Sequence, residues 1–154
     1  MLPILPISAV TLLFGLVLLN VAMFTSGWTA NSVGDGTGLV PYDDTLGWWA
    51  ASSVLIYLSS AFYWVAIGVF GLAVFKASST GIQSSKLLFV ICFFISLILS
   101  SCILVAFIIT AVNVNSLSLD IDIHIGYSVY LALLSAVTSL ATGGLCLYTV
   151  IVNK

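Results

Sequence analysis

Three side chains that could bind a metal ion alternate along one short segment, as Asp120, Asp122 and His124. If that segment is a β-strand, side chains two residues apart point the same way, so two carboxylates and an imidazole would share one face. Such a set could coordinate a divalent cation. The alternative is a solvated strand face, because three ligands on one exposed strand seldom form a closed site. We expect the solvated face, and a solvated turn for the acidic pair at 43–44.

Residues suited to catalysis are few. His124 is the only histidine, so only one side chain is of the type that transfers protons near neutral pH. The cysteines, Cys92, Cys102 and Cys146, form no Cys-x-x-Cys motif, which argues against a disulfide-exchange enzyme. We expect them to be small buried residues, with acylation of Cys92 or Cys146 as the alternative. The sequence therefore predicts a protein that is not an enzyme and needs no cofactor.

The elements that must position these residues are four long apolar runs. Hydrophobic residues make up 62% of the 154 residues and charged residues 5%, against about 25% charged in soluble domains. Each run exceeds the roughly 20 residues with which an α-helix crosses the hydrocarbon of a bilayer. The sequence predicts an all-α membrane protein, a four-helix transmembrane bundle that forms one domain over residues 1–154. The predicted spans are 4–25, 46–75, 87–112 and 125–152.

The charged residues are sorted by sign among the gaps between the runs. All five aspartates lie in the gaps 26–45 and 113–124, whereas the three lysines lie at the two ends of the gap 76–86 and at residue 154. Lysines close to the ends of spans mark the cytoplasmic face. We therefore expect cytoplasmic termini, a short flexible polar loop at 76–86 inside, and two outer loops, in the plasma membrane rather than the endoplasmic reticulum.

Both outer gaps contain the signals of β-strands. Apolar and polar residues alternate from 115 to 125, and a period of two over this length predicts a half-buried strand at 116–125. The first gap has two strand-like stretches, 28–33 and 37–42, around the turn-forming tripeptide Gly34-Asp35-Gly36. Because an isolated strand or hairpin gains little stability, we expect the two gaps to pair. The product would be a small extracellular β-sheet that caps the bundle.

Polar and small residues inside the runs predict which helix faces meet. Tyr57, Tyr63 and Trp64 need partners for their polar atoms, so we expect them to face protein. Small residues at every fourth position let helix backbones approach closely. Packing inside the bundle is their expected role, and self-association is the alternative. They are Ser96 and Ser100 in the third run, and Ser135, Ser139 and Gly143 in the fourth.

Several motifs in this layout resemble those of the claudin superfamily, which includes the peripheral myelin and epithelial membrane proteins. The first gap resembles the family's Trp…Gly-Leu-Trp signature, without its second tryptophan and without the two cysteines that follow in the family. The fourth run resembles the last span of those proteins, with its Gly-aromatic start and its glycine pair. The resemblance implies a divergent claudin-like tetraspan with a β-capped outer face. The motif positions are Trp28, Gly38, Leu39, Gly126, Gly143 and Gly144.

Two functions fit this set of features. The first is an auxiliary subunit whose spans pack against a larger membrane complex, such as a channel, receptor or lipid-handling assembly. The second is a cell-adhesion or junction protein that self-associates through its extracellular face. The near absence of charge and the short tails favour the first, because no cytoplasmic motif is available for a scaffold. The lipid bilayer is the expected surrounding, and three lysines are too few for a nucleic-acid surface.

The placement of the lysines makes a prediction about topology. Tags fused before Met1 and after Lys154 should both resist protease added to intact cells, because both ends are expected in the cytoplasm. A tag inserted in the gap 26–45 is the control and should be digested, as measured by immunoblot. Digestion of either terminal tag from outside would reverse the predicted orientation.

Overall fold

The computed structural model describes residues 4–31, 36–39, 46–117 and 123–152. All four of its helices are long and apolar enough to cross a membrane, which confirms the predicted four-helix fold. The helices are α1 (Ile4–Phe24), α2 (Gly47–Thr80), α3 (Ile82–Leu117) and α4 (Tyr127–Val152). The strands are β1 (Thr29–Asn31), β2 (Gly36–Thr37) and β3 (Ile123–Ile125).

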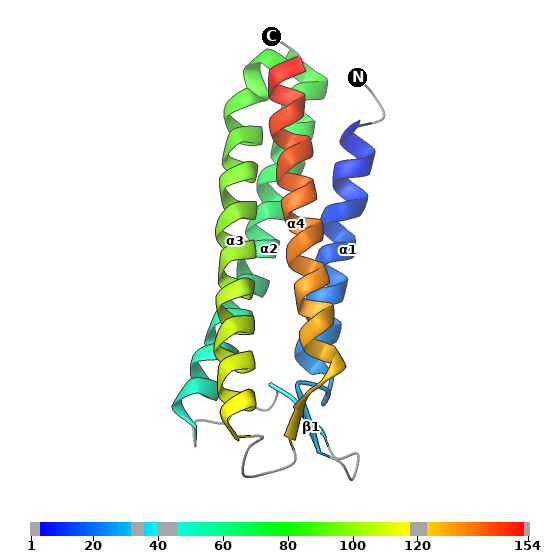
Figure 1. Cartoon of the computed structure of the whole chain (residues 1–154). Coiled ribbons are helices and arrows are strands. Elements are labelled where there is room, and N and C mark those ends of the chain that lie inside the picture. Colours follow the sequence, from blue (N-terminus) through cyan, green and yellow to red (C-terminus); the bar gives the residue numbers. More distant parts are fainter. Residues whose placement is uncertain (1–3, 32–35, 40–45, 118–122, 153–154) are drawn as a thin grey trace.

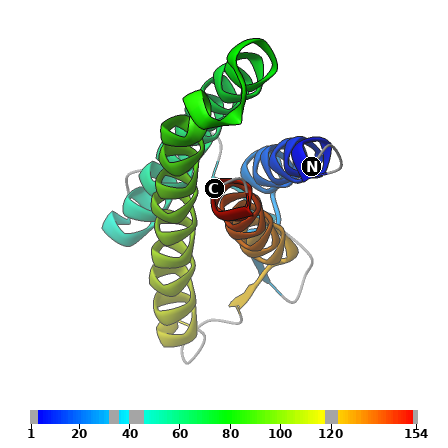
Figure 2. The ribbon, with the colours of Figure 1, turned by 90° about the horizontal axis from the view of Figure 1, so that it is seen from above.

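The helices run up and down along one bundle, with the strands at one end (Figure 1). The helix ends at Ile4 and Val152 lie at the other end, together with the turn between α2 and α3. We name these the sheet end and the terminal end. Seen from above, α1 and α4 lie side by side, with α2 and α3 across from them (Figure 2). The larger contacts join α2 to α3, α3 to α4 and α4 to α1, and α1 touches α2 less.

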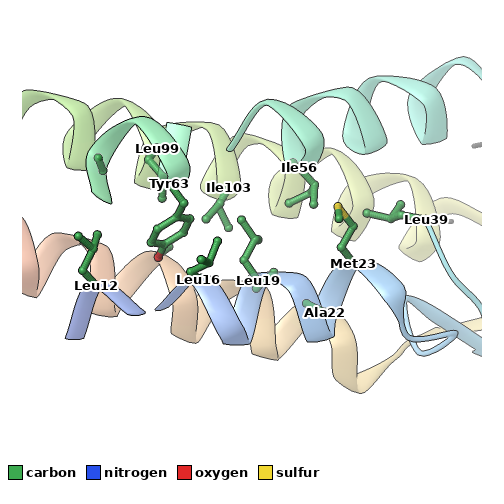
Figure 3. Packing of buried hydrophobic residues seen from close by; sticks show 14 of the residues in the cluster. Leu12, Leu16, Leu19, Ala22, Met23, Leu39, Ile56, Tyr63, Leu99 and Ile103 are labelled. Carbon is green, nitrogen blue, oxygen red and sulfur yellow. The ribbon is translucent and has the colours of Figure 1, made fainter. Parts of the chain in front are cut away.

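Buried aliphatic side chains from three helices fill the centre of the bundle around Tyr63 (Figure 3). Large apolar side chains also cover the outer faces of all four helices, as at Val17, Leu72, Ile108 and Val137. A surface of this kind suits lipid tails, which are as apolar as the side chains themselves. The buried aliphatic residues labelled in the figure are Leu12, Leu16, Leu19, Ile56, Leu99 and Ile103.

A chain of hydrogen bonds joins three helices near the middle of the bundle. The Tyr63 hydroxyl of α2 is fully buried and donates to the carbonyl of Ser135 in α4, at 2.8 Å. The Ser135 hydroxyl in turn donates to the carbonyl of Gly15 in α1, also at 2.8 Å. Hydrogen bonds between membrane helices are worth about 0.6–2 kcal/mol each. The expectation that Tyr63 faces protein is therefore confirmed.

The other two polar aromatic residues of α2 differ from each other. Tyr57 is half-buried, and its hydroxyl donates to the Leu39 carbonyl at 2.6 Å, as expected of a residue that faces protein. Trp64 exposes 62% of its surface, so the protein that it was expected to face is not supplied by this bundle. Trp64 directly follows the inward-facing Tyr63, and the rotation of about 100° per residue turns it to the outside of the helix.

Four of the five small residues at every fourth position pack α3 against α4, and the fifth, Ser135, joins α4 to α1 and α2, which confirms the expected role inside the bundle. The Ser100 hydroxyl donates to the Ala136 carbonyl at 3.0 Å, and the Ser139 hydroxyl donates to the Ser96 carbonyl at 3.4 Å. A Cβ atom added to Gly143 would lie 2.9 Å from the Ser96 Cβ, so the two helices approach too closely for a larger residue.

The predicted polar loop at 76–86 is wrong, because helix continues from both sides up to Gly81. Only this glycine separates α2 from α3, with a φ of 87° that a residue with a side chain seldom adopts. Its N–H donates to the Ala77 carbonyl at 3.1 Å, which closes the end of α2. Ser78 and Thr80 donate to carbonyls of their own helix, so a segment that reads as a loop by composition is satisfied as a helix.

The strand predicted over 116–125 is wrong in its first part. Helix α3 continues into the predicted gap as far as Leu117. Strand β3 covers only Ile123–Ile125, and residues 118–122 lie outside the described part. Asn113 donates to the Ile109 carbonyl and Ser116 donates to the Asn113 carbonyl, both at 2.8 Å. These bonds satisfy polar side chains on the helix itself, so alternation of polar and apolar residues did not require a strand there.

The close approach of α1 to its neighbours makes Gly15→Ala a destabilising substitution. A Cβ atom at Gly15 would lie 2.3 Å from the Tyr63 Oη and 2.6 Å from the Thr138 Oγ1, so the hydrogen-bond chain must shift. We expect the free energy of unfolding, measured by thermal unfolding in detergent micelles, to fall by about 1–3 kcal/mol. The matched control is Gly144→Ala, where an added Cβ meets nothing within 4 Å and stability should hold or rise slightly. Equal melting temperatures for the two variants would contradict this role of Gly15.

Candidate functional site

The two outer gaps meet in a three-stranded antiparallel sheet in the order β2-β1-β3. In β1, Thr29 pairs with Thr37 of β2 on one side and with Ile125 of β3 on the other. The Thr29 and Thr37 side-chain hydroxyls also hydrogen-bond to each other. This register confirms that two strands of the first gap pair with each other and with the second gap. Gly36, predicted as part of the turn, belongs to β2, and residues 34–35 lie outside the described part.

Trp28 connects this sheet to the helices. Its side chain is 1% exposed, and its indole N–H donates to the Ala22 carbonyl near the end of α1, at 2.5 Å. Its backbone N–H donates to the Thr37 carbonyl at 3.1 Å, and its carbonyl accepts from the N–H of Gly126 at 3.0 Å. One residue therefore holds the end of α1, strand β2 and the start of α4 in a fixed arrangement.

Glycine at 126 allows two backbones to touch. A Cβ atom added to Gly126 would lie 2.1 Å from the Gly27 carbonyl oxygen, which is closer than real Cβ atoms come. That same carbonyl accepts from the N–H of Ser128 at 2.9 Å, inside the first turn of α4. The Thr25 and Ser128 hydroxyls are also 2.6 Å apart and hydrogen-bonded. The start of α4 is thus attached to the chain that leaves α1.

Gly27 belongs to the same contact, and sequence reasoning missed it. A Cβ atom added there would lie 2.3 Å from the ring of Tyr127, so a larger residue would have to displace this exposed ring. Its sequence signal is weak, since it is one glycine directly before Trp28. The contact depends on a residue about 100 positions away in the chain, and no local pattern reports such a pairing.

The Gly38-Leu39 motif attaches the first gap to α2. Leu39 is fully buried, and it lies near Met23 and Ile56 at the sheet end of the core (Figure 3). Its carbonyl accepts the hydrogen bond from the Tyr57 hydroxyl. A Cβ atom added to Gly38 would lie 2.8 Å from the Thr25 carbonyl oxygen.

The structure brings four of the six motif positions together at the sheet end and leaves two apart. Trp28, Gly38, Leu39 and Gly126 all lie where helices and sheet join. The glycine pair lies in the other half of α4. Gly143 packs against α3, whereas Gly144 is exposed and faces open space.

The candidate metal ligands do not form a site that the structure can describe. His124 is exposed in β3, while Asp120, Asp122 and the pair 43–44 lie outside the described residues. Among residues 4–31, 36–39, 46–117 and 123–152, no three His, Cys, Asp or Glu residues gather around a point. Among the described residues of the sheet end, the geometry mainly fixes elements to one another.

The cysteines are free thiols. Cys92 and Cys146 are buried, as expected of small apolar residues, and Cys102 is partly exposed.

A family model described as "Tight junction protein, Claudin-like" matches residues 1–151. The chain belongs to this claudin-like family. The match confirms the resemblance that Trp28, the Gly38-Leu39 pair and the start of the fourth run indicated. None of the curated proteins matches the chain. The claudin-like protein is therefore a multi-pass membrane protein of a tight-junction-type family, and its four apolar helices agree with this assignment.

Gly126→Ala should separate the sheet from α4, because its Cβ would collide with a backbone oxygen that cannot turn away. We expect the free energy of unfolding of the claudin-like protein in micelles to fall by about 1–3 kcal/mol. Gly47→Ala, at the first residue of α2, is the matched control because nothing lies within 4 Å of its Cβ. If Gly126→Ala and Gly47→Ala unfold at the same temperature, the contact between residues 27 and 126 does not stabilise the fold.

Proposed function

We propose that the claudin-like protein is a non-enzymatic auxiliary subunit that packs against a larger membrane complex, such as a channel, receptor or lipid-handling assembly. The observation that supports this proposal is where the exposed apolar surface lies. Large apolar side chains are exposed along all four helices, which makes the lateral surface the principal one for contact with a membrane partner. Residues such as Val10 and Phe75 expose more than half of their surface.

The sheet end supports the same proposal because its apolar motif side chains are buried in the fold. Trp28 and Leu39 are buried, so the family-motif side chains hold the fold together and are not available to a partner. Among the strand residues whose side chains the structure describes, the exposed ones are Thr37 and His124, and both are polar. Surfaces of this kind contribute little to a stable interface, which needs buried aromatic or aliphatic anchors.

The interior of the bundle favours a role without transport. Every buried side-chain nitrogen and oxygen of the described residues has a hydrogen-bond partner. The polar groups bond within their own helix, as Ser53 does to Trp49, or between helices, as Tyr63 does to Ser135, and aliphatic residues fill the space between the helices. A transporter normally carries ionisable residues deep inside its spans. Here two lysines lie close to the turn between α2 and α3, the third is residue 154, and the aspartates lie in the gaps 26–45 and 113–124.

We infer the orientation from the same charges. The terminal end carries Lys76 and Lys86 near the turn between α2 and α3, which supports a cytoplasmic position for it and for both termini. The sheet end would then face outside, in the plasma membrane.

A junction protein that self-associates through its extracellular face is the second candidate. The family description, which names tight junctions, supports it. The two candidates differ in what would contact the protein: a larger partner along the helices, or further copies at the sheet end.

Purification from native membranes in mild detergent, followed by mass analysis of the intact complex, tests the proposal. We expect a stoichiometric complex with one larger membrane protein, because the lateral surface is the main apolar surface. The control is the same purification after the complex is dissociated in a harsher detergent, which should release the single chain. A ladder of homo-oligomers without a larger partner would support the junction role instead.

A further inference from the structure

One face of α2 carries a stripe of residues that points away from the bundle. Its five positions follow one another at spacings of three and four residues, and all five are exposed. This spacing aligns side chains along one side of a helix, and it is the spacing by which membrane helices pack at small crossing angles. We name these positions the α2 seam: Ala61, Trp64, Gly68, Gly71 and Phe75.

The two glycines of the α2 seam have no role inside the bundle. A Cβ atom added to Gly68 or Gly71 would meet nothing within 4 Å, in contrast to Gly15, where two side chains lie in the way. Glycine is less favourable than alanine in the interior of a helix. An open glycine therefore destabilises the helix without improving the packing inside the bundle. Exposed glycines do, however, let the backbone of a second helix approach closely in a membrane.

Trp64 lies at a depth where lipid cannot accept a hydrogen bond from its indole N–H. The adjacent Tyr63 bonds to Ser135, which is eight residues, or about 12 Å, from the start of α4. The hydrocarbon of a bilayer is about 30 Å thick, so this level is near its middle. No hydrogen bond joins the Trp64 indole N–H to another residue in the described part of the chain. Neither water nor lipid headgroups reach this depth to replace it.

We propose that the α2 seam binds a transmembrane helix of a partner protein that presents a hydrogen-bond acceptor on a small residue opposite Trp64, and bulky apolar side chains opposite Gly68 and Gly71. The large Trp64 and Phe75 would enter spaces between side chains of the partner, and the partner's large side chains would enter the two glycine positions. This inference rests on the proposed auxiliary role and names the face through which it operates.

A second copy of the chain does not fit the α2 seam. Two copies in one membrane are related by a two-fold axis along the membrane normal, so their α2 helices run parallel and equivalent positions face each other. Trp64 would then meet Trp64, which places two donors together without an acceptor. The two large indoles would also hold the helices apart, so Gly68 could not approach Gly68 closely. The seam therefore fits a helix of complementary sequence.

Photo-crosslinking in native membranes tests the α2 seam in the full chain. A benzoylphenylalanine replaces Phe75 on the seam or, as the matched control, Phe94 on α3, which is similarly exposed to lipid at 57%. We expect one protein adduct of defined mass from position 75 and only lipid adducts from position 94. Adding Gly68→Leu should reduce the adduct at least tenfold, and adding Trp64→Phe should reduce it severalfold by removing the N–H together with part of the apolar ring system.

Gly144→Leu is the control for a bulky side chain on an open, lipid-facing glycine, and it should leave the adduct unchanged. Unfolding temperatures of all variants establish that they remain folded. An adduct with the mass of two copies, or a yield that Gly68→Leu and Trp64→Phe do not change, would overturn the inference. If a larger partner still co-purifies in that case, the auxiliary role stands and only the α2 seam is wrong. If no larger partner co-purifies with the unaltered protein, the auxiliary role fails as well.

Discussion

The interior of a bilayer supplies no hydrogen bonds, and the architecture of this protein depends on that constraint. Hydroxyl side chains meet it in two ways. Many bond to a carbonyl one turn earlier in their own helix, as Ser53 does to Trp49 and Thr149 does to Leu145. Others bond across helices, as in the chain from Tyr63 through Ser135 to Gly15. Because serine is also small, the same residues that satisfy polar groups let the helices pack closely.

At the sheet end the protein itself, rather than the bilayer, removes backbone groups from water, as the burial of Trp28 shows. Where the chain leaves α1, its backbone groups need partners, and the three short strands supply them together with the first turn of α4. The strands are too short to be stable alone. Their stability comes from the attachment to the helices through the Trp28 side chain and the Tyr57 hydroxyl. Cap and bundle are therefore parts of one folding unit, which agrees with the match of the family model over nearly the whole chain.

Because the polar groups inside the bundle are hydrogen-bonded, a polar group on the lipid-facing surface without such a bond stands out. Most of the outward face consists of aliphatic and phenyl side chains, which lipid tails solvate without loss. A tryptophan N–H near mid-depth and two open glycines on one stripe of α2 do not follow this rule. Gly144 of α4 is also an open glycine, but the α2 stripe combines open glycines with the tryptophan N–H. A face that binds a membrane partner should differ in this way from a face that lipid alone covers.

Composition, periodicity and charge determined the fold class from the sequence alone. Runs of 20 or more apolar residues allow hardly any structure other than a membrane-crossing helix, so four helices and a charge-sorted layout followed directly. The hairpin in the first gap and its pairing with the second were also predictable, because glycine turns and strand-like segments have local signals. Family-motif positions such as Trp28 and Gly126 could be named in advance, but their roles could not.

The tertiary structure decided the features that depend on distant partners. Alternating residues near 115 remained helical because Asn113 and Ser116 found carbonyls on their own helix, which outweighed the strand pattern. The polar segment at 76–86 stayed helical for the same reason, up to a glycine that could adopt a positive φ. Gly27 acquired its importance only through a ring about 100 residues away. Local sequence specifies which backbone states are accessible, and contacts between distant segments select among them.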